Sequence, residues 1–302
     1  MMTDQSFAIT DLGTFNSGDE SFQNTLGGSG SFAQGINNYA QVVGTSHTDT
    51  GPIHAFLWDP RNLLQDLLPD SLLSSAWGIN DSGQAVGALD TASGSDAFLW
   101  DNVNGLQDLG TLGGPRSSAH DINGAGQVVG VSTTDYSTTD YQRSLQGFAR
   151  AFLWDNVNGL QDLGTLGGDA SAAYAINDSG YVVGDSDTAN GDRHAFLWSS
   201  KGGLYDLGTL GGDLSSAYGI NSGGWVVGNA VIGNGEWHAF VWTSEGMQDL
   251  GTLPGGDYSL ATGITSDGVV VGYSKTQSEI PITDWITRSC GTAQAVYSIS
   301  TA

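Results

Sequence analysis

The chain has 302 residues, enough to bury a large core, and its formal net charge is −24 with only eight lysines and arginines. A surface this negative repels phosphate backbones, which excludes nucleic acid and anionic membranes as partners. The single cysteine, Cys290, excludes an internal disulfide framework and a cysteine zinc site, and no apolar run reaches the roughly 20 residues that cross a bilayer.

The composition predicts an all-β chain, because glycine is frequent (46 residues) and no segment has the i, i+3, i+4, i+7 apolar spacing of a helix. In chain order, the first expected element is a lone strand over residues 7–15, which contains Asp-Leu-Gly-Thr-Phe. After it, a motif related to Ile-Asn-x-x-Gly-x-Val-Val-Gly begins six times, in steps of 43, 43, 54, 44 and 44 residues, at Ile36, Ile79, Ile122, Ile176, Ile220 and Ile264.

Two more motifs recur between these starts. Ala-Phe-Leu-Trp, or a close variant, begins at Ala55, Ala97, Ala151, Ala195 and Ala239. Asp-Leu-Gly-Thr-Leu begins at Asp108, Asp162, Asp206 and Asp249. The sequence of each unit therefore predicts four short strands. The segment Ser215 to Asn221 is an example of the first strand of a unit. Four strands in a repeat of about 40–45 residues are typical of a β-propeller.

The chain ends predict how the ring closes. After the sixth unit the sequence offers one more strand-like segment, Ala295 to Ser298, so the strand at 7–15 is expected to complete the last blade, 259–302. We expect a single domain over residues 1–302, a six-bladed β-propeller with four antiparallel strands per blade. Because a closed ring leaves no free sheet edge, we also expect a monomer.

One position of the first strand varies from unit to unit. It holds Gln34, Trp77, His120, Tyr174, Tyr218 and Thr262. The variation allows an asymmetric ligand pocket that includes Trp77, His120, Tyr174 and Tyr218, with packing between blades as the alternative. His120 is the best acid or base candidate among them.

Two loops between second and third strands are longer than the repeat requires. The first, 133–147, carries Tyr136, Tyr141 and Arg143, and the second, 275–292, carries Trp285 and Arg288. Rigid scaffolds display binding residues on such loops, so these five residues are candidate ligand contacts. Tolerated surface insertion is the alternative, because long loops add little closure entropy.

Specific catalytic motifs are missing, including the nucleophile elbow, the P-loop, the dinucleotide fingerprint and His-Glu-x-x-His. We therefore expect no cofactor. The repeated aspartate before Leu-Gly-Thr is expected to bond to backbone amides, and the tryptophans of Ala-Phe-Leu-Trp to fill the core between blades. Asp169, Asp213 and Asp257 each follow Gly-Gly, so calcium binding stays open.

The repeated motifs resemble the HAF-repeat family, described as probable extracellular repeats. The triplet His-Ala-Phe begins at His54, His194 and His238, and Asp-Leu-Gly-Thr-Leu-Gly-Gly begins at Asp108, Asp162 and Asp206. The resemblance implies a secreted or cell-surface protein of bacterial or archaeal type and no particular reaction. Because no signal-peptide pattern follows Met1 and Met2, an intracellular protein remains the alternative.

Two hypotheses about function follow. The first is an extracellular or cell-surface binding module for a carbohydrate, another small molecule or a protein partner. The alternative is an enzyme, such as a glycan lyase, hydrolase or cyclase, with its site in the cleft at the axis. His120, Tyr174 and Tyr218 would then be the acid, base and positioning groups.

Overall fold

The computed structural model describes residues 27–48, 51–61, 63–92, 94–134, 149–275 and 292–298. These residues form strands and turns without a helix, as the sequence predicts. None of them belongs to a helix long and apolar enough to cross a membrane. The expected strand at 7–15 lies outside the described residues.

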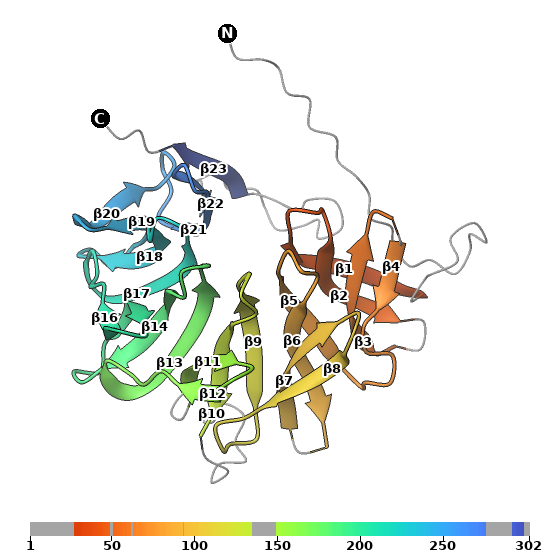
Figure 1. The fold of residues 1–302 in the computed structure, drawn as a ribbon. Helices are drawn as coiled ribbons and strands as arrows, with labels where there is room; N and C mark the ends of the chain where they lie inside the picture. Colours follow the sequence, from red (N-terminus) through yellow and green to blue (C-terminus); the bar gives the residue numbers. More distant parts are fainter. Residues whose placement is uncertain are drawn as a thin grey trace.

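The strands form antiparallel hairpins that follow one another along the chain (Figure 1). Three sheets have four strands each. They contain β1 (Gly27–Ile36), β2 (Val42–Thr48), β3 (Ile53–Asp59) and β4 (Leu63–Asp66); β5 (Ser74–Ile79), β6 (Ala85–Thr91), β7 (Gly94–Asp101) and β8 (Gly105–Gly110); and β9 (Ser117–Ile122), β10 (Val128–Thr133), β11 (Ala149–Asp155) and β12 (Gly159–Asp162).

An eight-stranded sheet comes next and has two halves, between which the one strand pairing is the parallel pair of Arg193 with Leu214. The halves are β13 (Gly167–Ile176), β14 (Val182–Thr188), β15 (Arg193–Ser199) and β16 (Gly203–Asp206), and β17 (Gly211–Ile220), β18 (Val226–Ile232), β19 (Trp237–Thr243) and β20 (Gly246–Gly251). The last sheet has β21 (Ser259–Ile264), β22 (Val269–Lys275) and β23 (Thr292–Ser298). The four predicted strands of each unit are thus confirmed wherever the structure describes them.

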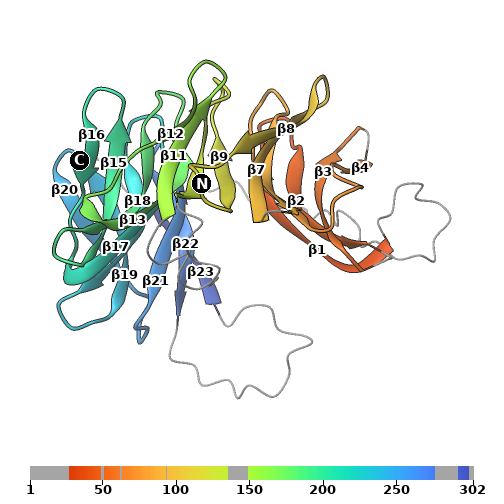
Figure 2. The ribbon, with the colours of Figure 1, turned by 90° about the horizontal axis from the view of Figure 1, so that it is seen from below.

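The strand groups follow an arc in chain order, and Figure 2 shows the same arc from below. The first strands of successive groups, β1, β5, β9, β13, β17 and β21, contact one another in that order. The β1–β4 and β21–β23 sheets stand at the two ends of the arc and lie apart in Figure 1. The described residues therefore form an open arc rather than a closed ring.

The hydrophobic core lies between neighbouring strand groups. One cluster joins Val43 and Leu57 of the first sheet to Ile79, Phe98 and Trp100 of the second. Equivalent clusters occupy the next four interfaces. The predicted placement of tryptophans between strand groups is confirmed for Trp100, Trp154, Trp198 and Trp242, whereas Trp58 packs against residues of its own sheet. The core forms between groups because each group by itself has too few layers to bury its apolar faces.

A serine at the start of the first strand ties each group to the one before it. At Ser215 the hydroxyl accepts a hydrogen bond from the Ala195 amide (2.8 Å) and donates one to the Gly208 carbonyl (2.6 Å). A small hydroxyl is needed there because Ser215 is fully buried beside backbone groups that require partners. The recurrence of serine in the repeat is thereby explained as scaffold.

Candidate functional site

The variable position of the first strands forms a row of rings in contact across four strand groups. Trp77 on β5 meets His120 on β9 edge to face, with ring centroids 5.9 Å apart. His120 stacks on Tyr174 of β13 at 5.6 Å, and Tyr174 meets Tyr218 of β17 at 5.3 Å. All four side chains are half-buried. We call Trp77, His120, Tyr174 and Tyr218 the aromatic row.

His120 is held as a neutral imidazole. Its Nδ1 lies 2.7 Å from the Ala173 carbonyl oxygen, which can only accept, so Nδ1 carries the proton and Nε2 remains an acceptor. Burial lowers the pKa of His120, although the bond to Ala173 opposes the shift. A neutral histidine with an available Nε2 is competent as a base and as a hydrogen-bond acceptor.

A polar network joins the aromatic row on the side of β14 and β17. The Asp185 carboxylate accepts hydrogen bonds from Ser216 Oγ (2.8 Å) and from the Tyr174 hydroxyl (3.3 Å). Asp185 is buried, and burial raises its pKa. Burial also raises the pKa of Tyr174 and Tyr218, and the Asp185 charge adds to both shifts, so both phenols stay protonated and able to donate.

The network continues to β18 and β22. Asn229 Nδ2 donates to the Tyr258 hydroxyl (3.3 Å), which lies 3.5 Å from the Tyr273 hydroxyl. The Tyr258 and Tyr273 rings stack with centroids 5.7 Å apart, and Lys275 Nζ lies 5.6 Å from the Tyr258 ring centre. Burial and the neighbouring phenol raise the pKa of Tyr258. We call Asp185, Ser216, Asn229, Tyr258 and Tyr273 the polar network.

Arg193 provides a cation at the edge of this network. Its Nε lies 2.8 Å from Asp187 Oδ1, and its charge also acts on Asp185 and Tyr174. Because Asp187 pairs with the guanidinium, Arg193 and Asp187 together add no net charge to the network. The site can therefore donate from phenols, accept at carboxylate and amide oxygens, and stack a flat ligand face on aromatic rings.

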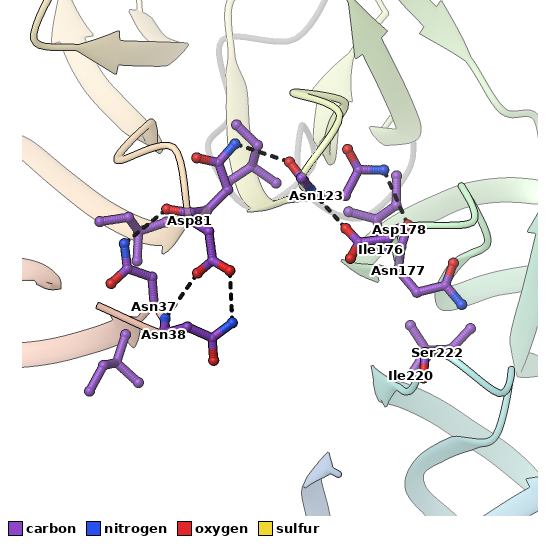
Figure 3. Close-up of a pocket in the computed structure, with 14 residues that line it drawn as sticks. Asn37, Asn38, Asp81, Asn123, Ile176, Asn177, Asp178, Ile220 and Ser222 are labelled. Atoms are coloured by element: carbon purple, nitrogen blue, oxygen red, sulfur yellow. Dashed lines mark hydrogen bonds between the residues drawn. The ribbon is translucent and has the colours of Figure 1, made fainter. Parts of the chain in front are cut away.

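An open pocket of about 320 Å³ lies elsewhere, where the Ile-Asn motifs turn from first into second strands (Figure 3). Its lining consists of residues from five successive motifs, and no member of the aromatic row or polar network belongs to it.

The asparagines that follow the motif isoleucines, four of which line this pocket, serve the scaffold. Each donates from Nδ2 to the main-chain oxygen of the equivalent residue in the next motif, over 2.9–3.1 Å, as Figure 3 shows in part. We call Asn37, Asn80, Asn123, Asn177 and Asn221 the asparagine ladder. Asp81 and Asp178 also bond to the preceding turns, at Asn38 and Gly124. These polar atoms are already engaged, so the pocket offers few groups to a ligand.

Two of the repeated motifs, His-Ala-Phe and Asp-Leu-Gly-Thr-Leu, bind each other through their histidine and aspartate. The histidine that opens His-Ala-Phe places Nδ1 2.7–2.9 Å from the aspartate of the next motif, in His54–Asp66, His194–Asp206 and His238–Asp249. The same aspartates accept from an amide two residues on, as at Gly208 N to Asp206 Oδ1 (2.8 Å). The expected bond of this aspartate to a backbone amide is confirmed. The contact between the histidine and the aspartate explains why the two motifs occur together.

Asp121 departs from the repeat, because glycine or alanine fills its position in the other units. Its carboxylate accepts from the amides of Ile122 and Ile176, each at 2.9 Å. Burial raises the pKa of Asp121 to about 6, and Asp178 nearby adds to the shift. A carboxylate that titrates near pH 6 beside the row residue His120 is a second candidate acid or base.

The structure brings together the four candidates of the first strand, and it leaves the loop candidates untested. Tyr136, Tyr141, Arg143, Trp285 and Arg288 lie outside the described residues. Asp169, Asp213 and Asp257 are all exposed, and no three His, Cys, Asp or Glu side chains of the described part gather as metal ligands would.

The sequence reasoning missed the second-strand half of the site. The position after the Val-Val-Gly glycine varies as strongly as the first-strand position, and it holds Thr45, Ala88, Val131, Asp185, Asn229 and Tyr273. Apart from Thr45, its polar members Asp185, Asn229 and Tyr273 fall in three consecutive strand groups. The variation that indicated the aromatic row would have indicated this column too.

Comparison with solved structures identifies the fold as that of a β-propeller. The β-propeller domain of the trilobed protease from Pyrococcus furiosus, described as having an open velcro topology, matches with a TM-score of 0.54 and 10% identity over 82% of this chain and 76% of that one. Oligogalacturonate lyase from Vibrio parahaemolyticus matches with a TM-score of 0.51 and 11% identity over 83% and 77%.

TolB from Acinetobacter baumannii matches with a TM-score of 0.49 and 14% identity over 74% of this chain and 54% of that one, so the chain spans about half of that protein. No protein-family model and no curated protein sequence matches the chain. At these identities the likeness shows the fold alone.

Proposed function

We propose that this protein is a β-propeller binding module that takes a carbohydrate on the aromatic row and the polar network. The observation that carries the proposal is the row itself, four half-buried rings in contact across four strand groups and joined to buried hydrogen-bonding groups. Sugars present apolar faces that stack on such rings and hydroxyls that bond to groups like Asp185. The HAF-repeat resemblance adds a secreted or cell-surface location to the proposal.

An enzyme is the second candidate, and one observation favours it. Burial keeps His120 neutral with Nε2 as an acceptor, and burial raises the pKa of the next residue, Asp121, to about 6. These properties suit general acid–base chemistry on a bound glycan. Tyr174 and Tyr218 would then position the substrate.

The proposed architecture is a six-bladed ring in which the β21–β23 sheet closes onto the β1–β4 sheet. Support comes from two exposed positions. The valine before the motif glycine is fully buried in five units, but Val271 in the sixth is 44% exposed. The motif isoleucine is 5–9% exposed at Ile79, Ile122 and Ile176, but Ile36 in the first unit is 69% exposed.

These two positions are partners at every described interface. The valine of one group and the isoleucine of the next belong to the same hydrophobic cluster. Val43 and Ile79 are one such pair, and Val227 and Ile264 are another. Val271 and Ile36 are the remaining pair, and burying such side chains is worth about 1.5–3 kcal/mol each. The segment 7–15 would add the fourth strand of the last blade, and the closed ring would be a monomer.

Crosslinking tests the closure. In a Cys290→Ser background, Ile36→Cys and Val271→Cys should form a disulfide within one chain on oxidation, as should the control pair Val227→Cys and Ile264→Cys. A crosslinked dimer would show that a second copy covers these faces. Failure to link where the control links would contradict closure.

A thermal-shift screen with lactose, maltose, cellobiose, xylobiose, chitobiose and digalacturonate tests the binding function. A saccharide at a hundredfold excess over its Kd adds about 2.7 kcal/mol of stability. The shift should disappear in Tyr218→Ala and persist in Tyr205→Ala, whose exposed ring lies on β16 away from the row. No shift with any of these sugars in the unmodified protein would refute the carbohydrate proposal.

Incubation with the bound saccharide then separates binder from enzyme. New products detected by mass spectrometry, and lost in His120→Ala, would replace the binding module by the enzyme. An unchanged saccharide after prolonged incubation would leave the binding module as the function.

A further inference from the structure

Asn229 carries a polar atom that the described protein does not satisfy. Its side chain is 3% exposed, and Nδ2 donates to Tyr258, but Oδ1 has no hydrogen-bond partner. A buried acceptor without a donor loses its hydration and gains nothing in return. Such an atom in a native protein requires an explanation from the surroundings of the site.

Packing does not require this amide. Asn229 occupies the second-strand position that the other repeats fill with Thr45, Ala88, Val131, Asp185 and Tyr273. The same local strand pairing therefore forms with small, branched, acidic and aromatic side chains. The first three repeats have Thr45, Ala88 and Val131 at this position, while the last three have the larger polar side chains Asp185, Asn229 and Tyr273 in successive strand groups of the arc.

Asn229 is connected to the aromatic row through Ser216 and Asp185. It lies opposite Ser216 in the β17–β18 register, so the two side chains share one face of the sheet. Ser216 donates to Asp185, which also accepts from the row residue Tyr174. Tyr218, the last ring of the row, is influenced by Ser216, Asp185 and Tyr273. The unpaired oxygen thus belongs to the same site as the rings.

At Asn229 the unused atom is an acceptor, so a ligand group that binds there has to be a hydrogen-bond donor. The Ser216 hydroxyl is committed to Asp185 and the Asn229 amino group to Tyr258, whereas Asn229 Oδ1 accepts nothing. A ligand group that meets Oδ1 must therefore carry hydrogen, as a sugar hydroxyl does. A carboxylate there would place two acceptors together beside the Asp185 carboxyl group.

We propose that Asn229 is a specificity-determining residue that accepts a hydrogen bond from a hydroxyl of a neutral saccharide and disfavours acidic sugars. This inference rests on the proposed carbohydrate function and adds the class of sugar. The apolar face of the sugar stacks on the aromatic row, and the polar network forms hydrogen bonds with the sugar hydroxyls. Asn229 contributes to ligand affinity and takes no part in a chemical step.

The test uses the full chain with lactose, maltose, cellobiose, xylobiose and chitobiose as neutral probes and digalacturonate as the acidic probe, each titrated by calorimetry. Asn229→Val reproduces the side chain of Val131 and removes the amide. We expect at least a tenfold loss of affinity for the bound neutral probe, with a Tm equal to or above that of the unmodified protein. Digalacturonate should bind the unmodified protein at least tenfold more weakly than that probe.

The outcomes separate the two proposals. No binding by any probe refutes the carbohydrate function, and this inference falls with it. Binding that Tyr218→Ala abolishes but Asn229→Val leaves within twofold refutes only the role of Asn229, as does tighter binding of digalacturonate. A lower Tm of Asn229→Val with unchanged saccharide affinity would show that Asn229 Oδ1 bonds to a buried water, and this also refutes the role of Asn229 in specificity. If Asn229→Val does not fold, Asn229→Thr, which reproduces Thr45, is held to the same criteria.

Discussion

Substitution of Asn123 in the asparagine ladder gives a large and calculable loss of stability. Asn123 is 3% exposed, and its side chain makes four hydrogen bonds. Nδ2 donates to Gln127 Oε1 (2.8 Å) and to the Asn177 main-chain oxygen (3.1 Å), while Oδ1 accepts from the amides of Ala125 and Gln127 (3.1 and 2.9 Å). Asn123→Ala removes all four.

The expected loss follows from these bonds. At about 1 kcal/mol for each, the loss in the free energy of unfolding is about 4 kcal/mol. For a chain of this size that corresponds to a fall in Tm of about 6 °C. Asn123→Thr should lose about half as much, because the Thr265 hydroxyl accepts the Val269 amide at the equivalent turn.

Urea unfolding followed by tryptophan fluorescence and circular dichroism measures both variants. Asn158→Ala is the matched control, because Asn158 lies in an exposed turn, and its loss should be below about 1 kcal/mol. A loss below about 1 kcal/mol for Asn123→Ala would refute the reasoning that the ladder joins one strand group to the next.

Three further predictions concern the same scaffold. Thr265 occupies the last position of the asparagine ladder, where it accepts from Asn221. If the ring closes, the side-chain amide of Thr265→Asn reaches Asn37 and should raise the free energy of unfolding by about 0.5–1.5 kcal/mol. In an open arc the substitution should leave the free energy of unfolding unchanged. Ala40 has a φ of 59°, which costs a non-glycine residue about 1 kcal/mol, so Ala40→Gly should raise Tm by about 2 °C, and a lower Tm would contradict this. The folded-state pKa of Asp121, about 6, lies above its unfolded value of about 3.9. Its stabilising contribution is therefore fully present only below about pH 4 and is lost as the pH rises through 6. The unmodified protein should lose about 2 kcal/mol relative to Asp121→Ala between pH 4 and 7.5 in urea unfolding, and a constant difference would refute the shift.

The strands were predictable because each repeat forms them locally. The turn glycines, such as Gly180 with a φ of 77°, mark hairpins in every unit, and the Ala-Phe-Leu-Trp and Val-Val-Gly segments pair within one sheet. Six aligned copies also act as internal controls, which separated invariant scaffold positions from the variable one that holds Tyr174 and Tyr218. The aromatic row was therefore predictable without knowledge of any distance.

The polar network was not predicted, because its contacts join strand groups that are far apart in the sequence. Asp185 meets Ser216 across 31 residues, and Asn229 meets Tyr258 across 29. Nothing local in either segment indicates its partner. The role of the ladder asparagines was hidden for the same reason, since each bonds to a carbonyl 43–54 residues away.

The sequence alone determined the all-β class, the repeating four-stranded unit and the position of the aromatic row, because hairpin turns and side-chain alternation are properties of short segments. The tertiary structure alone decided which buried polar atoms find partners. It pairs the His-Ala-Phe histidines with aspartates, passes hydrogen bonds along the asparagine ladder and leaves Asn229 Oδ1 unpaired. Those outcomes depend on how neighbouring sheets face each other, since a buried donor or acceptor is satisfied only by a group that the fold brings within hydrogen-bond distance.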